Sequence, residues 1–121
     1  MSGYLPNHNM DPNVVGGSDF QSLWTYTSPV TNDNVFAKPL VYTPLATGVE
    51  VVVTASESNW VRVFNAKTGD LLASRQLNVP FLAADGACND IPNFIGVTGT
   101  PIIDPATDIM YVFAKGYKDR K

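Results

Sequence analysis

Trp60-Val-Arg-Val-Phe-Asn-Ala-Lys-Thr-Gly-Asp-Leu-Leu72 is the stretch of this sequence that decides the fold. Its first six residues alternate in character, so a strand here sends Trp60, Arg62 and Phe64 to one face and the two valines between them to the other. A period of two is typical of a β-strand that has different surroundings on its two faces. We therefore predict a strand over Trp60 to Asn65.

The sequence after this strand favours a tight turn. Lys67-Thr-Gly-Asp70 places Gly69 where such turns require a positive φ, which glycine adopts without steric cost. Leu71 to Leu77 then returns as the next strand, so the two runs form a hairpin. Gly69 is in this way a structural residue of the predicted fold.

Three runs upstream are rich in valine and aromatic residues, which are enriched in strands. They are Phe20 to Thr27, Val35 to Tyr42 and Val49 to Ala55. Residues 1–19 mix Asn, Pro, Gly and Asp with few apolar side chains, which predicts an irregular lead-in. Since no stretch keeps a helical period, the expected fold class is all-β.

The sequence also contains an approximate internal repeat. Pro39 to Ala55 recurs, with small gaps, as Pro101 to Ala114, and Pro101 lies 62 positions after Pro39. A recurrence of this length, built from strands and turns, indicates a blade-type repeat. A closed β-propeller has at least four blades of about 40 residues, so 121 residues hold roughly one and a half. We expect a lead-in over 1–19, a blade over 20–77, an interblade loop over 78–95 and the start of a next blade over 96–121.

These segments resemble the repeats of quinoprotein-type β-propellers, the superfamily that includes the PQQ-dependent alcohol dehydrogenases. In that family a strand ending in Asp- or Asn-Ala-x-Thr-Gly leads into the next strand, as Asn65 to Gly69 does here. Gly96 to Thr107, followed by Met110-Tyr-Val-Phe113, is similar to the first hairpin of a following blade, and Asn7 to Tyr26 is similar to the lead-in. The resemblance implies an incomplete propeller: one antiparallel four-stranded blade plus the first hairpin of a second, with Pro101 as a structural residue of that hairpin.

The resemblance is specific for fold, and many proteins with these repeats bind no quinone. We therefore expect a non-catalytic fragment of a quinoprotein-like β-propeller, with the function of the parent protein open and no cofactor on the isolated chain. A second interpretation is part of an oxidoreductase acting on alcohols or sugars, in which PQQ and Ca²⁺ carry the chemistry. A third is a binding module that self-associates to complete a ring. The expected partners are thus further copies of the chain or the remaining blades of a parent propeller.

Few side chains are candidates for a site. Trp60, like Trp24, offers an aromatic face on which a quinone or a sugar can stack, whereas a tryptophan in a propeller strand more often packs between blades. Cys88 lies in a polar loop, Asp85 to Pro92, and the resemblance implies a disulfide with a cysteine outside this chain. A free structural thiol and a reactive thiol are the alternatives for Cys88.

The metal-binding candidates are sparse. His8 is the only histidine, and no second His or Cys stands at the spacing of a zinc site. Asp85, Asp90 and Asp104, with Asn89, offer oxygens that suit Ca²⁺, but their spacing matches no calcium-binding loop. We interpret these carboxylates as solvated loop residues and turn caps, and we expect no catalytic or metal-ligating residue.

Composition narrows the classes of partner and location. The formal net charge of −3 gives no basic footprint for nucleic acid, and no apolar run approaches the roughly 18 residues of a membrane-spanning helix. Met1 to Met10 lacks the basic start and apolar stretch of a secretory signal, although the parent family is often secreted or periplasmic. The location therefore stays open.

Overall fold

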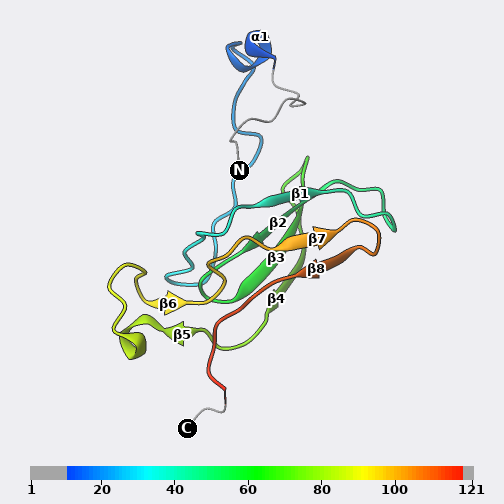
Figure 1. Cartoon of the computed structure of the whole chain (residues 1–121). Helices are drawn as coiled ribbons and strands as arrows, with labels where there is room; N and C mark the ends of the chain where they lie inside the picture. Colours follow the sequence, from blue (N-terminus) through cyan, green and yellow to red (C-terminus); the bar gives the residue numbers. More distant parts are fainter. Residues whose placement is uncertain (1–10, 119–121) are drawn as a thin grey trace.

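Four of the predicted runs pair into one antiparallel sheet, in the order β1-β2-β3-β4 (Figure 1). This computed structural model describes residues 11–118. The strands are β1 (Leu40–Tyr42), β2 (Val51–Ala55), β3 (Trp60–Asn65) and β4 (Leu71–Gln76). Because each strand pairs with the next along the chain, the sheet is a simple meander. The expected all-β class is confirmed.

Two short hairpins follow the sheet. The first pairs β5 (Phe81–Leu82) with β6 (Phe94–Ile95), and the 3₁₀ helix η1 (Ala83–Gly86) lies between these strands. The second pairs β7 (Ile102–Asp104) with β8 (Ile109–Tyr111), which confirms the hairpin predicted after Gly96. The segment 78–95, expected as a loop, thus contains two short strands and a helical turn.

The predicted strand over Phe20 to Thr27 is wrong, because no residue of this segment joins a ladder. Trp24 and Tyr26 contact a face of the sheet instead, and a segment that crosses a face cannot extend the edge. The strand predicted from Val35 is shorter and begins at Leu40. Pro39 has no N–H to donate, and the N–H of Lys38 donates to Thr100 Oγ1 at 3.1 Å instead of to a strand.

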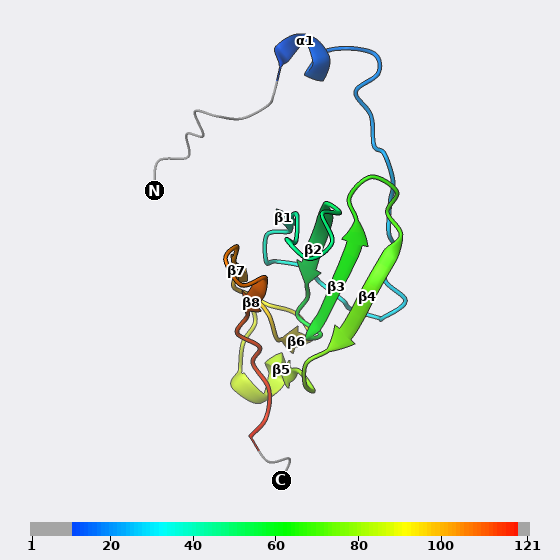
Figure 2. The same cartoon turned by 90° about the vertical axis from the view of Figure 1, so that its right-hand side faces the viewer.

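The lead-in is also more regular than expected. It contains α1 (Pro12–Val15), whose N-cap Asp11 accepts a hydrogen bond from the N–H of Asn13 at 2.9 Å. An Asp N-cap followed by Pro at the first helical position is a strong helix start, although here it supports one turn only. The helix buries none of its residues and lies away from the sheet in both views (Figures 1 and 2). Between residues 11 and 118, no helix is long and apolar enough to cross a membrane.

The β7–β8 hairpin covers one face of the sheet, as Figure 2 shows from the side. We call this the hairpin face. Its apolar side chains on β2 and β3 form the core together with Ala37 and Val97. These side chains are Val51, Val53, Ala55 and Val61. From the opposite layer Ile103, Met110 and Val112 pack against them. Val61 and Val63 therefore point as the sequence predicted.

The opposite face of the sheet is covered in part by residues 22–34, and we call it the lead-in face. It carries Val41, Val52 and Thr54 together with Arg62 and Phe64, since residues directly paired across strands share a face. The chain thus has three layers: hairpin, sheet and lead-in segment. The two faces of β3 differ because these two covering layers differ.

The turn between β3 and β4 holds Gly69 at a positive φ, as the sequence predicts. Its φ is +77°, and the Asn65 side chain accepts hydrogen bonds from the N–H groups of Lys67 and Thr68. Beyond the turn, Val63 pairs with Ala73 but Phe64 with Leu71, so β4 carries one extra residue as a bulge. A Cβ at Gly69 would lie 2.6 Å from Cγ of Trp24, so this glycine also makes room for the lead-in segment.

Gly69→Val is expected to destabilise the fold for two reasons, and Gly48→Val isolates one of them. Both glycines have positive φ, which costs a β-branched residue about 1 to 2 kcal/mol, but a Cβ at Gly48 meets nothing within 4 Å. We expect Gly69→Val to lower the free energy of unfolding by more than Gly48→Val, with a change in tryptophan fluorescence. Urea unfolding measures the free energy of unfolding of both variants. An equal decrease in both would show that the packing of Trp24 does not require a glycine at position 69.

Candidate functional site

Two aromatic rings of the lead-in segment pack onto the lead-in face beside Phe64. The ring centroids of Trp24 and Tyr26 lie 5.7 Å and 4.7 Å from that of Phe64, both in tilted arrangements. The indole N–H of Trp24 donates to the carbonyl of Ala66 at 2.9 Å. Phe64 is only 2% exposed because these rings cover it. Trp24 is therefore a packing residue, and its N–H has the hydrogen-bond partner that a buried indole requires.

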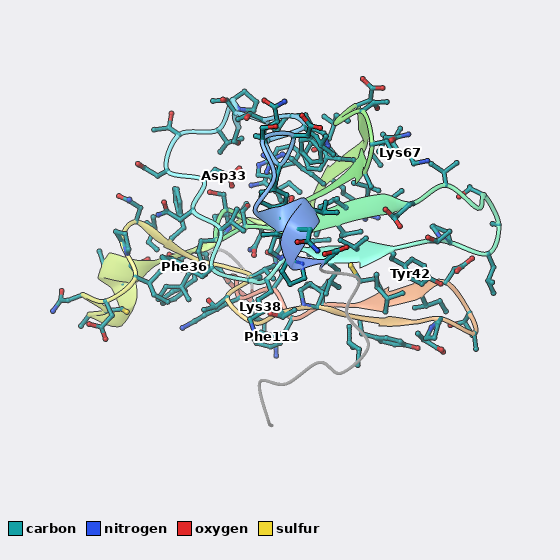
Figure 3. The ribbon with its side chains drawn as sticks, turned by 90° about the horizontal axis from the view of Figure 1, so that it is seen from above. Asp33, Phe36, Lys38, Tyr42, Lys67 and Phe113 are labelled. Carbon is teal, nitrogen blue, oxygen red and sulfur yellow. The ribbon has the colours of Figure 1, made fainter. Side chains whose placement is uncertain are left out.

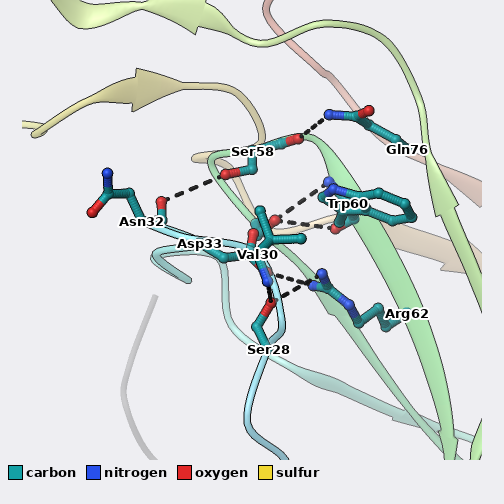
Figure 4. A network of polar contacts seen from close by, with 9 residues as sticks. Ser28, Val30, Asn32, Asp33, Ser58, Trp60, Arg62 and Gln76 are labelled. Atoms are coloured by element: carbon teal, nitrogen blue, oxygen red, sulfur yellow. Dashed lines mark hydrogen bonds and ion pairs between the residues drawn. The ribbon is translucent and has the colours of Figure 1, made fainter.

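A buried ion pair lies next to these rings, between β3 and the lead-in segment (Figure 4). Arg62 Nη1 is 2.7 Å from Asp33 Oδ2, and the side chains are 4% and 2% exposed. Ser28 Oγ accepts from Arg62 Nη2 at 3.1 Å and donates to Asp33 Oδ2 at 2.5 Å. The serine thus joins both charges in one network, which a buried ion pair needs to offset its desolvation.

The surroundings of Asp33 keep its carboxylate ionised. Burial by itself raises the pKa of the Asp33 carboxyl, but the hydroxyl groups of Ser28 and Ser56, together with the charge of Arg62, outweigh burial and hold the pKa below its ordinary value. Asp33 Oδ1 is buried and has no hydrogen-bond partner among the described residues. The ion pair therefore joins the lead-in segment to β3 with the Asp33 carboxylate in its charged form.

Trp60, the candidate for stacking a cofactor, is half-buried on the same face. The guanidinium carbon of Arg62 lies 5.3 Å from the centre of its ring and 5.7 Å from that of Tyr26. This is within the range of a cation–π contact. The ring of Trp60 is therefore already engaged by the side chain of Arg62.

A hollow of about 390 Å³ opens on the lead-in face between the lead-in segment and the sheet. Tyr26, Val52 and Thr54 line it together with Asp33 and Arg62. Its walls are mainly apolar, and its two charges neutralise each other, so it suits an apolar side chain better than a charged substrate. No three His, Cys, Asp or Glu side chains come together as metal ligands within residues 11–118.

A second buried polar group joins the sheet to the segments after it. Glu57, in the turn between β2 and β3, is 0% exposed, and its Oε2 accepts from Gly96 N–H at 2.7 Å and Thr98 Oγ1 at 3.1 Å. Asn59 Nδ2, equally buried, donates to the carbonyl of Lys115 at 2.8 Å and to the side chain of Asn78. A Cβ at Gly96 would overlap the Glu57 carbonyl, so only glycine permits this approach.

Neither buried polar group was predicted from the sequence. Ser56 to Asn59 looks like an ordinary solvated turn, and Asp33 lies 29 positions before its partner. One signal was available for the ion pair: Arg62 stands between Trp60 and Phe64 on the predicted aromatic face. A charge in such a place requires a partner when the face is covered.

The turn of the β7–β8 hairpin also forms hydrogen bonds with the sheet and with the turn after β1. Tyr42 donates its hydroxyl hydrogen to Asp108, whose carboxylate accepts from the N–H groups of Leu45 and Ala46 as well. The bond to Asp108 raises the pKa of Tyr42 to about 12 and lowers the pKa of the Asp108 carboxyl. The contact joins β1 to a turn 66 positions further along the chain.

The remaining sequence candidates do not converge on one place. Pro101 is buried and directly precedes β7. Cys88 is a free, half-buried thiol after η1, and a disulfide with a cysteine outside this chain stays a prediction. Asp85 accepts from the Tyr117 hydroxyl, Asp104 caps its own turn by accepting from Ala106 N–H and Thr107 Oγ1, and Asp90 is exposed. His8 lies outside the described residues.

The side of the β7–β8 hairpin that faces away from the sheet is apolar and uncovered. We call it the outer hairpin face; it consists of Ile102, Ile109, Tyr111 and Phe113, which are 69%, 49%, 58% and 79% exposed. Figure 3 places Phe113 on the far side of the hairpin from the sheet and Tyr42 between the two layers. Exposed apolar groups of this kind mark sites of interaction.

Comparisons of the chain with protein-family models, with curated proteins and with solved structures find no match.

Asp33→Asn tests the contribution of the buried ion pair. The variant leaves Arg62 buried without a counter-charge, so near neutral pH we expect the free energy of unfolding to fall by about 3 to 5 kcal/mol. Because folding lowers the pKa of Asp33, the stability it contributes is present above the ordinary value of 3.8 and is lost as the pH falls below it. Urea unfolding at neutral and acidic pH should show both effects.

Asp90→Asn is the matched control, since Asp90 is exposed. It is expected to unfold as the wild type does at every pH. A loss in Asp33→Asn no larger than in this control would contradict a stabilising role for the ion pair.

Proposed function

We propose that the chain is a non-catalytic segment of a quinoprotein-like β-propeller, supplying one four-stranded sheet and the opening hairpin of the next. Its contribution is structural: it presents sheet faces on which further sheets pack. The function of the whole propeller is a separate question. The observation that carries this proposal is that the two copies of the sequence repeat form equivalent hairpins that pack on each other.

The two copies of the repeat form equivalent hairpins. β1 pairs with β2 and β7 pairs with β8, both antiparallel, and each residue of β1 has its equivalent 62 positions later, as Leu40 has in Ile102. The turn of the second hairpin is four residues shorter, so equivalents on the second strands lie 58 positions apart, as Val53 and Tyr111 do. The first hairpin is continued by β3 and β4, which complete a four-stranded unit.

The second hairpin packs face to face on the sheet that contains the first. Repeat architectures bury their apolar faces in this way, with each unit contacting its neighbours only. The packed arrangement supports reading the β7–β8 hairpin as the beginning of a second unit. A four-stranded antiparallel unit followed by a stacked second one is what a propeller requires.

The polar groups near the sheet favour a structural role over a catalytic one. Asp33 and Arg62 bind each other, Trp60 is covered on one side by Arg62, and Glu57 holds the backbone of Gly96. A quinone dehydrogenase needs a cofactor held on both faces and a metal held by several oxygens. If the chain is part of an oxidoreductase, the groups that hold the quinone and the metal must come from other parts of the parent protein.

The chain alone is expected neither to bind PQQ with micromolar affinity nor to reduce a dye with alcohols or sugars as donors. Calorimetric titration with PQQ in excess Ca²⁺, followed by a dye-reduction assay, measures both. A one-to-one isotherm with dye reduction that Trp60→Ala abolishes would overturn the proposal and favour the oxidoreductase. Val14→Ala, on the exposed helix α1, is the control for a nonspecific loss of activity.

A further inference from the structure

The repeat shows what the outer hairpin face is equivalent to. Its residues Ile102, Ile109 and Tyr111 correspond to Leu40, Val51 and Val53 of the hairpin face. Val51 and Val53 are only 5% and 7% exposed because the β7–β8 hairpin covers them. The outer hairpin face is thus the same surface one unit later, without its cover.

The complementary surface is also present on the chain. The side chains by which the hairpin covers the sheet are Ile103, Met110 and Val112, and their equivalents in the first hairpin are Val41, Val52 and Thr54. These lie on the lead-in face, where Trp24 and Tyr26 pack at the Phe64 end. At the β1 end, Val41 remains 66% exposed. One chain therefore carries both halves of an interface that it already forms once internally.

We propose that a second copy of this chain docks head to tail, with the outer hairpin face of one copy on the β1–β2 end of the lead-in face of the next. The two surfaces are different patches, so the contact is heterologous, and it can be repeated until a ring closes. The inference uses the internal repeat behind the proposed function but does not depend on the quinoprotein assignment.

Both patches offer apolar side chains to a second copy. On β7 and β8 the exposed side chains of the outer hairpin face are aliphatic or aromatic, and Asp104, the acid that shares this side of the hairpin, accepts from Ala106 N–H and Thr107 Oγ1 in its own turn. An apolar partner that covers β7 and β8 therefore meets a carboxylate that already has hydrogen-bond donors. The internal contact also shows that side chains in these positions pack together, since Ile103 and Met110 do so against the core.

Two variants that each block one patch test the proposal by complementation. Phe113→Asp places a charge on the outer hairpin face, and Val41→Asp places one on the lead-in face; both side chains are exposed, at 79% and 66%. In sedimentation equilibrium we expect the wild type to have at least twice the mass of one chain. Each variant alone should have the mass of a monomer. An equimolar mixture should form a one-to-one dimer, because one intact patch remains on each variant.

Val14→Asp is the control, since Val14 is 64% exposed on α1, away from both patches, and this variant should associate as the wild type does. Circular dichroism checks that each variant folds, and Ile102→Lys replaces Phe113→Asp if that variant does not. A monomeric wild type, single variants that still associate, or a mixture that fails to dimerise would each overturn the proposal.

The measured outcomes distinguish the head-to-tail docking from the non-catalytic function. PQQ binding by a head-to-tail assembly would overturn the non-catalytic function and leave the docking intact. A strictly monomeric chain that binds no quinone would overturn the docking and leave the proposed function standing.

Discussion

The packing of the β7–β8 hairpin on the four-stranded sheet is the contact on which the rest of the structure depends. A sheet of four short strands has two faces, and strands are stable in water only when an apolar face is covered. The hairpin supplies that cover for the valines of β2 and β3. The contact also places Gly96 against Glu57 and Asp108 against Tyr42, so the polar bonds between the layers follow from the apolar one.

The lead-in face is covered by different means. Its aromatic contacts resemble an ordinary core, but Arg62 brings a charge under the cover and requires Asp33 and Ser28 to accompany it. An apolar residue in place of Arg62 would avoid that desolvation. The ion pair positions the lead-in segment, because Asp33 must lie beside Arg62 on β3 to form it. This requirement fixes where the irregular segment crosses the sheet.

The sequence predicts the local parts of this fold and misses the parts that depend on distant residues. Trp60 to Asn65, the Gly69 turn and the following strand were correct to within a residue, because alternation and turn chemistry act between near neighbours. Phe20 to Thr27 was wrong because strand propensity does not distinguish a segment that joins an edge from one that crosses a face. Glu57 was missed since a polar turn becomes buried only when residues 39 positions away are packed on it.

The buried turn at Glu57 also has a consequence for the order of events as the chain is synthesised. The sheet from β1 to β4 is complete once residue 76 is available, but the partners of Glu57 and Asn59 are Gly96, Thr98 and Lys115. Until these emerge, the carboxylate keeps its water and the hairpin face has no cover. Contacts between such distant positions form late and slowly. A nascent chain therefore passes through a stage in which its first sheet exists with an uncovered valine surface, and such a surface is prone to aggregate.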